Sequence, residues 1–251
     1  WRTDPNTNAA LPYLDKITFT NVKEGSQRAA AVRRGTLDAG MFTSFSEGTF
    51  IKDLRQRKSV VTEFKSKNEY YPSLWLNQGK TGSPLANKNA RLAVTSCIDR
   101  VNFVKVRAKG ESVVAKSLVG PSSVMYTTRG FSKFSPKAAR DFLAAYKAET
   151  GATSLTLSIP ADSSSASQAN AKFLINQWAK CGITVNMVVE ETAVIIAKAF
   201  NAAPKVANGE YYNAYDAISI LLYEGTDVTF NLPFTVTNMF PSTATCATGS
   251  G

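Results

Sequence analysis

The residue types that most hydrolytic and metal chemistry needs are missing from this sequence. None of the 251 residues is histidine, which excludes Ser-His and Cys-His catalytic arrangements within the chain and removes the commonest metal ligand. No two acids form a spaced pair suited to general acid–base catalysis, the strongest candidates being Asp38, Asp99, Glu224 and Asp227. We therefore expect a protein that is not an enzyme and that uses no metal and no cofactor.

The three cysteines, Cys97, Cys181 and Cys246, form no C-x-x-C pair, which argues against a structural zinc or a thioredoxin-like site. Cys97 and Cys181 fall on apolar positions of expected helices, where thiols usually serve as small hydrophobic residues. We predict that both are buried and that they are not bonded to each other. Because the count is odd, at least one thiol has no partner in the chain, and the redox compartment stays open.

The net charge is +10, from 29 Lys and Arg against 19 Asp and Glu. Such a balance is compatible with a nucleic-acid or membrane-surface partner. The charges are scattered, however, and the densest stretch, 52–67, is interrupted by Asp53 and Glu63 and lacks regularly interleaved aromatics. This distribution favours a basic protein without a nucleic-acid partner. No run of about 18 apolar residues predicts a membrane-spanning helix.

The N-terminal quarter alternates between strand-like and helix-like patterns. Residues 17–22 (ITFTNV) alternate apolar and polar side chains, which predicts a strand. An Ala- and Arg-rich helix then follows, ended by Gly35. We expect a β-α-β-α-β order, completed by a strand at 39–43, a helix at 46–56 and an extended segment at 60–64.

The rest of the chain is also α/β. Residues 71–77 are expected to be extended, and apolar spacing predicts one helix over 89–105. Ser135-Pro136 is typical of a helix start, and Gly151 of a helix end. Further on, helices are expected at 166–180 and 192–200, with a loop at 201–213. Alternation predicts three strands of one mixed sheet, at 155–159, 183–189 and 217–222.

Four stretches together resemble the family 5 extracellular solute-binding proteins, the peptide- and nickel-type binding components of ABC importers. The first, LPYLDKITFTNVKEGSQRAAAVRRGTLDAG, carries Leu14-Asp15, Arg28 and Gly35 with Asp38 at the family's positions. The second, LNQGKTGSPLANKNARLAVTSCIDR, carries the family's Arg-x-Ala and Asp-Arg on one helix. The others are FSPKAARDFLAAYKAETG and FLINQWAKCGITVNM, and the order and spacing of all four agree over residues 12–230.

The resemblance implies a type II periplasmic-binding-protein fold, a clamshell of two α/β lobes that closes on its ligand across a hinge. Residues 1–69 would be part of the first lobe, residues 70–213 the second lobe, and residues 214–251 the return strand across the hinge with a polar tail. The family's N-terminal part and C-terminal end are missing, and Trp1 is not followed by a signal-peptide pattern. We therefore expect a fragment of a longer protein.

The same resemblance implies an extracytoplasmic protein, in the periplasm or lipid-anchored at the cell surface. It would act as a monomer, capture a peptide or similar small polar solute, and deliver it to an ABC permease. Candidate ligand-binding residues lie near the two crossings between the lobes: Tyr71, Trp75, Asn77, Tyr223, Glu224 and Asp227. Tyr223 stands where the family usually has Trp, and Asp227 stands near the acid that pairs with a ligand amino group. Val228 replaces the family's proline, which puts an ordinary peptide ligand in doubt.

Plainer interpretations remain for these residues. Tyr223 and Trp75 could be packing residues between strand and helix, and Asp227 a solvated turn residue. Asp99 and Arg100 are typical of the family and are expected to be structural. An alternative function is the ligand-sensing domain of a transcription regulator, which the +10 charge favours slightly. A DNA-binding domain preceding the chain would establish it.

Overall fold

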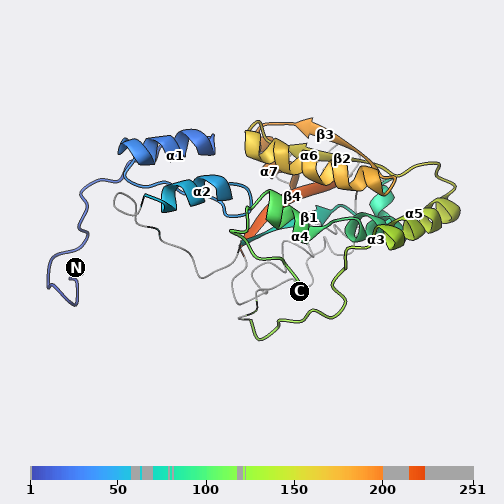
Figure 1. The fold of residues 1–251 in the computed structure, drawn as a ribbon, viewed down its shortest axis with the longest axis horizontal. Helices are drawn as coiled ribbons and strands as arrows, with labels where there is room; N and C mark the ends of the chain where they lie inside the picture. The colour runs from blue at the N-terminus through green and yellow to red at the C-terminus, as the bar shows by residue number, and fades with distance from the viewer. Residues whose placement is uncertain are drawn as a thin grey trace, which may run out of the picture.

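A computed structural model describes residues 2–57, 63, 70–78, 80, 82–117, 121, 123–199 and 215–223. Figure 1 shows two groups of elements, which we name by their residues. The N-terminal unit is 2–57, and the main unit comprises 70–199 with 215–223. No described helix has the length and apolar character that crossing a membrane requires.

The N-terminal unit contains two helices, α1 (Gly25–Arg34) and α2 (Gly48–Arg55), which lie side by side (Figure 1). Gly35 ends α1 in the left-handed conformation at φ 72°, as its position in the sequence predicted. The strands expected at 17–22 and 39–43 are wrong, because neither segment pairs with another described segment. A strand needs a neighbour for its backbone N–H and C=O groups, and alternation alone does not supply one. The extended segment expected at 60–64 lies almost wholly outside the described residues.

The main unit begins with β1 (Tyr70–Leu76), which pairs antiparallel with the last described strand, β4 (Ala217–Tyr223). Between them come the 3-10 turn η1 (Pro84–Ala86) and the helices α3 (Lys88–Ser96), α4 (Arg100–Val106) and α5 (Pro136–Thr150). Then follow β2 (Thr156–Ala161), α6 (Ser165–Lys180), β3 (Thr184–Val189) and α7 (Thr192–Ala199). The loop expected at 201–213 lies outside the described residues.

The strands expected near 155–159, 183–189 and 217–222 are confirmed, but a single sheet of all three is wrong. β2 pairs with β3 in parallel, whereas β4 pairs with β1, giving two sheets of two strands. The side chain of Asp216, one residue before β4, explains the separation. Its Oδ2 accepts the Ser158 backbone N–H at 2.7 Å, so a carboxylate takes a bond that a neighbouring strand would otherwise make.

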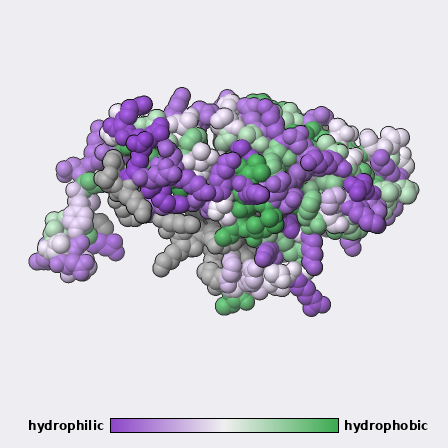
Figure 2. Space-filling view, viewed as in Figure 1, coloured by the Kyte–Doolittle hydropathy of each residue, from purple (hydrophilic) through white to green (hydrophobic). Residues whose placement is uncertain are grey.

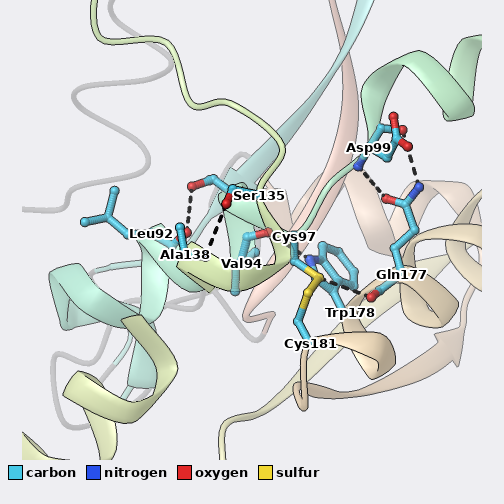
Figure 3. Close-up of a disulfide and its surroundings, with 10 residues drawn as sticks. Leu92, Val94, Cys97, Asp99, Ser135, Ala138, Gln177, Trp178 and Cys181 are labelled. Carbon is cyan, nitrogen blue, oxygen red and sulfur yellow. Dashed lines mark hydrogen bonds between the residues drawn. A yellow bond between two sulfur atoms is a disulfide. The ribbon is translucent and has the colours of Figure 1, made fainter. Parts of the chain in front are cut away.

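The core of the main unit lies between β2, α3, α5 and α6. Trp178 is completely buried there, and its Nε1 donates to the Val94 carbonyl at 3.0 Å (Figure 3). Ser135 begins α5 as predicted, since its Oγ accepts the Ala138 N–H at 3.2 Å. The single helix expected over 89–105 is wrong, because the chain breaks at 97–99 into α3 and α4.

A disulfide between Cys97 and Cys181 lies at that break. Both residues are 1% exposed, which confirms their predicted burial, but the prediction that they are not bonded to each other is wrong. Cys97 is the C-cap of α3 and Cys181 the C-cap of α6, and their Cα atoms lie 6.3 Å apart. Figure 3 shows the sulfurs bonded beside Trp178, so the bridge fastens two helix ends to one core.

Candidate functional site

A cavity of about 820 Å³ lies between the N-terminal unit and the main unit. The N-terminal unit contributes Lys23, Arg28 and the segment 43–47 (without Ser44). The main unit contributes the end of β2, the first turn of α6 and parts of α4 and α7. The space beyond the carboxyl end of a strand is where α/β proteins commonly bind ligands. It is also large enough for a solute of drug or small-peptide size.

The polar end of the cavity is built where β2 gives way to α6. Asp162 follows the strand directly, and its Oδ1 accepts the Ser164 N–H at 2.7 Å. Ser164 is the N-cap of α6 and accepts the Ser167 N–H at 3.3 Å. The end of β2 and the start of α6 therefore bring the Asp162 carboxylate and the hydroxyl groups of Ser164 and Ser167 to the cavity wall.

On the opposite wall, Arg28 and Glu47 form an ion pair with little exposure to solvent. Arg28 also donates to the carbonyls of Val22 at 2.6 Å and Lys23 at 2.9 Å. Glu47 accepts the Thr43 N–H at 2.8 Å. A buried pair with its remaining hydrogen bonds satisfied is a rigid unit, so Arg28 and Glu47 hold segment 43–47 against the cavity.

Arg100 enters the cavity from the first position of α4. Its Nη2 donates to the Ser132 carbonyl, and its guanidinium carbon lies 4.7 Å from the centre of the Phe131 ring. Burial lowers the pKa of Arg100, and the neighbouring Asp99 opposes this shift. The Arg100 guanidinium is therefore partly shielded from water.

Apolar side chains make up most of the remaining wall. They come from several elements of the main unit: Leu74, Ile98, Phe103, Leu174, Ile195 and Ile196. Phe103 is fixed by an edge-to-face contact with Phe173, with ring centres 5.4 Å apart. Figure 2 shows hydrophilic residues over α1 and α2 at the upper left and hydrophobic surface near the centre of the same face. Because its wall combines these apolar side chains with the polar groups described above, the cavity suits a solute with both an apolar body and polar groups.

Those of the predicted ligand-binding residues that the structure describes lie toward the two ends of the β1–β4 pair. Tyr71 pairs with Leu222, and Tyr223 with Tyr70, so the backbones of the two tyrosines meet at one end. Trp75 lies near the other end, opposite Ile218. Since Tyr71 and Asn77 are six residues apart, about 20 Å separates these ends. One small solute cannot contact both groups at once.

Trp75 and Asn77 are buried at 3% and 0% exposure, and neither lines the cavity. The Asn77 side chain donates to the Tyr215 carbonyl at 3.1 Å, and its Oδ1 accepts the Lys80 N–H at 3.1 Å. Asn77 therefore joins the ends of the two crossing strands. Glu224 and Asp227 lie outside the described residues, and the side chains of Tyr71 and Tyr223 are not among those described.

Sequence reasoning missed Asp162, Phe131 and Ser132 and assigned Arg100 a purely structural role. Asp162 carried a usable signal, because it lies shortly after the strand expected at 155–159, and polar residues beyond strand ends of α/β proteins commonly face the ligand. Phe131 and Ser132 lie in an irregular stretch without periodicity, so no pattern indicates them. Among the described residues, no cluster of three or more Cys, Asp or Glu side chains could hold a metal ion.

The model of the bacterial extracellular solute-binding proteins, family 5 Middle, matches residues 1–237. The chain belongs to this family. The match covers nearly the whole chain, and it confirms the predicted periplasmic-binding-protein fold class. No curated protein sequence matches it.

Solved family 5 structures share the fold. The substrate-binding domain of an oligopeptide ABC transporter from Bacillus anthracis str. Ames matches with TM-score 0.60 and 18% identity over 87% of this chain. Peptide-bound OppA of Listeria monocytogenes matches with TM-score 0.63 and 16% identity over 87% of this chain. MoaA of A. tumefaciens R10, in complex with mannopinic acid, matches with TM-score 0.64 and 15% identity over 83% of this chain. The chain covers 43%, 43% and 38% of these three structures, less than half of each.

Proposed function

We propose that the protein is the solute-capturing component of an ABC importer and that it binds a peptide or similar small polar solute. One observation carries the proposal: a solute-sized cavity with mixed lining lies between two units of a family 5 chain. The family match and the transporter neighbours support a binding protein rather than an enzyme. The permease partner and the monomeric state are part of the proposal.

Capture would proceed by closure of the units around the solute. The N-terminal unit contacts the main unit on both sides of the cavity. On one side Lys23 lies 3.7 Å from Glu191, and on the other Arg55 lies 2.8 Å from Glu111. The exposed Lys23–Glu191 contact contributes little stability, whereas Arg55 and Glu111 form a two-point bond. Both contacts are polar, and we expect them to separate and re-form as a solute enters and leaves.

The disulfide supports an extracytoplasmic location, because such bonds persist in oxidising compartments. It also favours the importer over a cytoplasmic transcription regulator that uses the same module. The family's own description as extracellular agrees with this location.

Two solute classes follow from the neighbours. OppA of Listeria is bound to peptide, and MoaA to mannopinic acid. Tyr71, Tyr223, Glu224 and Asp227 are proposed to contact the solute. Trp75 and Asn77 are proposed to support the crossing strands instead.

The test is calorimetry on the full-length protein with a mixed tripeptide pool. Ala166 lines the cavity in the first turn of α6, so Ala166→Trp should fill it and weaken binding more than tenfold. Ala148→Trp places the same side chain at an exposed position of α5 and should bind like the parent. Equal binding by all three proteins would contradict the assignment of the cavity. No binding by the parent would contradict peptide capture.

A further inference from the structure

We propose that Arg100, Phe131 and Ser132 form a subsite for a carboxylate of the captured solute, whose apolar part rests on Phe103, Leu174 and Ile195. The inference rests on the proposed solute-binding function. It adds the chemical group that the protein selects and the residues that select it.

Among the charged side chains that the described part of the chain brings to the cavity wall, Arg100 is the cation that forms no ion pair. Arg28 is paired with Glu47, and Lys23 lies near Glu191 and donates to Ser163. Among the described residues no carboxylate forms an ion pair with Arg100. Asp99, its neighbour in the chain, instead accepts the Asn102 N–H at 2.9 Å as the N-cap of α4.

The contacts of Arg100 leave donors for a solute. A guanidinium carries five N–H donors, and the bond to the Ser132 carbonyl uses one of them. The Phe131 ring holds the plane of the group. A half-buried cation without a counter-ion is costly, and a carboxylate that forms a two-point bond with it removes that cost.

Ser132 adds a second donor at the same place. Its hydroxyl oxygen is inaccessible to solvent and has no hydrogen-bond partner among the described residues, although the residue lines the cavity. Buried hydroxyl groups are almost always hydrogen-bonded, so an unused one beside an unpaired cation indicates a missing acceptor. A carboxylate has enough lone pairs to accept from both residues.

The rest of the wall selects for a carboxylate over a dianion such as phosphate. Asp162 also lines the cavity, and the other cations that the described residues place on its wall, Lys23 and Arg28, already lie near carboxylates, so a second negative charge would find no free cation among them. The wall near Arg100 is apolar, which suits a single charge on a hydrophobic body.

Local structure fixes Arg100 before any solute arrives. The break between α3 and α4 is held by the disulfide on one side. On the other, Asp99 N–H donates to Gln177 Oε1 at 2.9 Å, and Gln177 Nε2 donates to the Asp99 carbonyl at 3.3 Å (Figure 3). Arg100 follows directly, so its backbone is anchored to α6. Such preorganisation lowers the entropy cost of binding.

The experiment is calorimetry on the full-length protein with two matched pairs of probes. One pair is 3-phenylpropanoate and 3-phenylpropanamide, and the other is Ala-Ala-Phe and its C-terminal amide. We expect at least one acid to bind ten- to a hundredfold more tightly than its amide. The pair that shows the preference identifies the source of the carboxylate as a small acid or a peptide C-terminus.

Variants assign the preference to residues. Arg100→Gln should abolish it, Arg100→Lys should retain part of it, and Ser132→Ala should reduce acid affinity severalfold. Arg129→Gln removes an exposed arginine from the same loop and should leave the preference unchanged. Thermal unfolding of each variant checks that it is folded.

Three results would overturn the subsite. They are equal binding of acid and amide, a preference that survives Arg100→Gln, and binding of the mixed tripeptide pool without any of the four probes. In each of these the proposed solute-binding function survives. Failure of the parent to bind the pool and all four probes would overturn both proposals.

Discussion

The carboxylate of Glu24 caps a helix of the other unit by accepting two hydrogen bonds from Ser165. The Ser165 backbone N–H donates to Oε1 at 3.1 Å and its hydroxyl donates to Oε2 at 2.7 Å. Ser165 is the first residue of α6, where the unpaired N–H groups and the helix dipole favour a negative charge. An acid at the start of α1 thereby ties the N-terminal unit to the wall of the cavity.

This contact predicts a pH dependence of docking between the units. The hydrogen bonds from the Ser165 hydroxyl and N–H lower the pKa of Glu24 below its ordinary value of 4.5. A lowered pKa means that the docked state favours the ionised acid. Its contribution is therefore fully present above pH 4.5 and is lost as the pH falls through the lowered pKa.

An NMR titration of the Glu24 side chain in the full-length protein measures this directly. Ser165→Ala removes the hydroxyl bond and should move the pKa of Glu24 back toward 4.5. If the parent and Ser165→Ala titrate together at 4.5, the contact does not exist in solution.

Loss of the Cys97–Cys181 bond should destabilise the full-length protein by about 4 kcal/mol. The reason is that the bridge joins residues 84 apart and so restricts the unfolded chain strongly. Urea unfolding with and without a phosphine reductant gives the difference. A Cys97→Ala/Cys181→Ala variant should already be weakened and should not respond to the reductant, and a response of the same size would point to Cys246 instead.

Removing the Asp216 side chain should be more damaging than removing its partner. Asp216 accepts the Ser158 N–H and hydroxyl at 2.7 and 2.9 Å and lies 2.8 Å from Lys80 Nζ. Asp216→Ala leaves the part-buried Ser158 N–H without its acceptor and removes a buried carboxylate, and it should cost about 2–4 kcal/mol of unfolding free energy. Lys80→Gln removes only the more exposed partner and should cost less than about 1 kcal/mol. Equal losses in urea unfolding would contradict this assignment.

Gly48 permits α2 to lie against the main unit. A Cβ at this position would collide with the carbonyl oxygen of Ala108. Alanine normally stabilises a helix by about 1 kcal/mol relative to glycine, but here Gly48→Ala should destabilise by a net of about 1–2 kcal/mol. Thr49→Ala, at the exposed neighbouring position, should be near neutral in the same thermal unfolding measurement. A stabilised Gly48→Ala variant would show that α2 does not dock there.

Sequence patterns predicted the structure best where a few adjacent residues determine the local conformation. Ser135-Pro136 and Gly151 set the ends of α5, because capping and left-handed glycine conformations depend on a few adjacent residues. The same holds for the first residues of β2 and β3, where Leu157 and Val185 are buried and the preceding Thr156 and Thr184 are exposed.

Sequence patterns failed where the conformation depends on contacts with residues far away in the chain. Residues 17–22 alternate like a strand, yet Phe19 is 93% exposed and no described segment pairs with them. The disulfide joins two apolar positions 84 residues apart, and spacing gives no sign of it. Arg100 became a site candidate only when folding placed it beside Phe131 and Ser132, which lie in an irregular stretch.

Hydrogen exchange of the full-length protein, with and without the mixed tripeptide pool, tests most directly that solutes bind between the two units. The account predicts slower exchange on binding in residues 43–47, 100–104 and 159–167, the segments that contribute most of the polar lining of the cavity. It predicts no change in the exposed half of α5, which carries Ala148 and lies away from the cavity. Protection confined to α5, or none in the three cavity segments while calorimetry records binding, would contradict it.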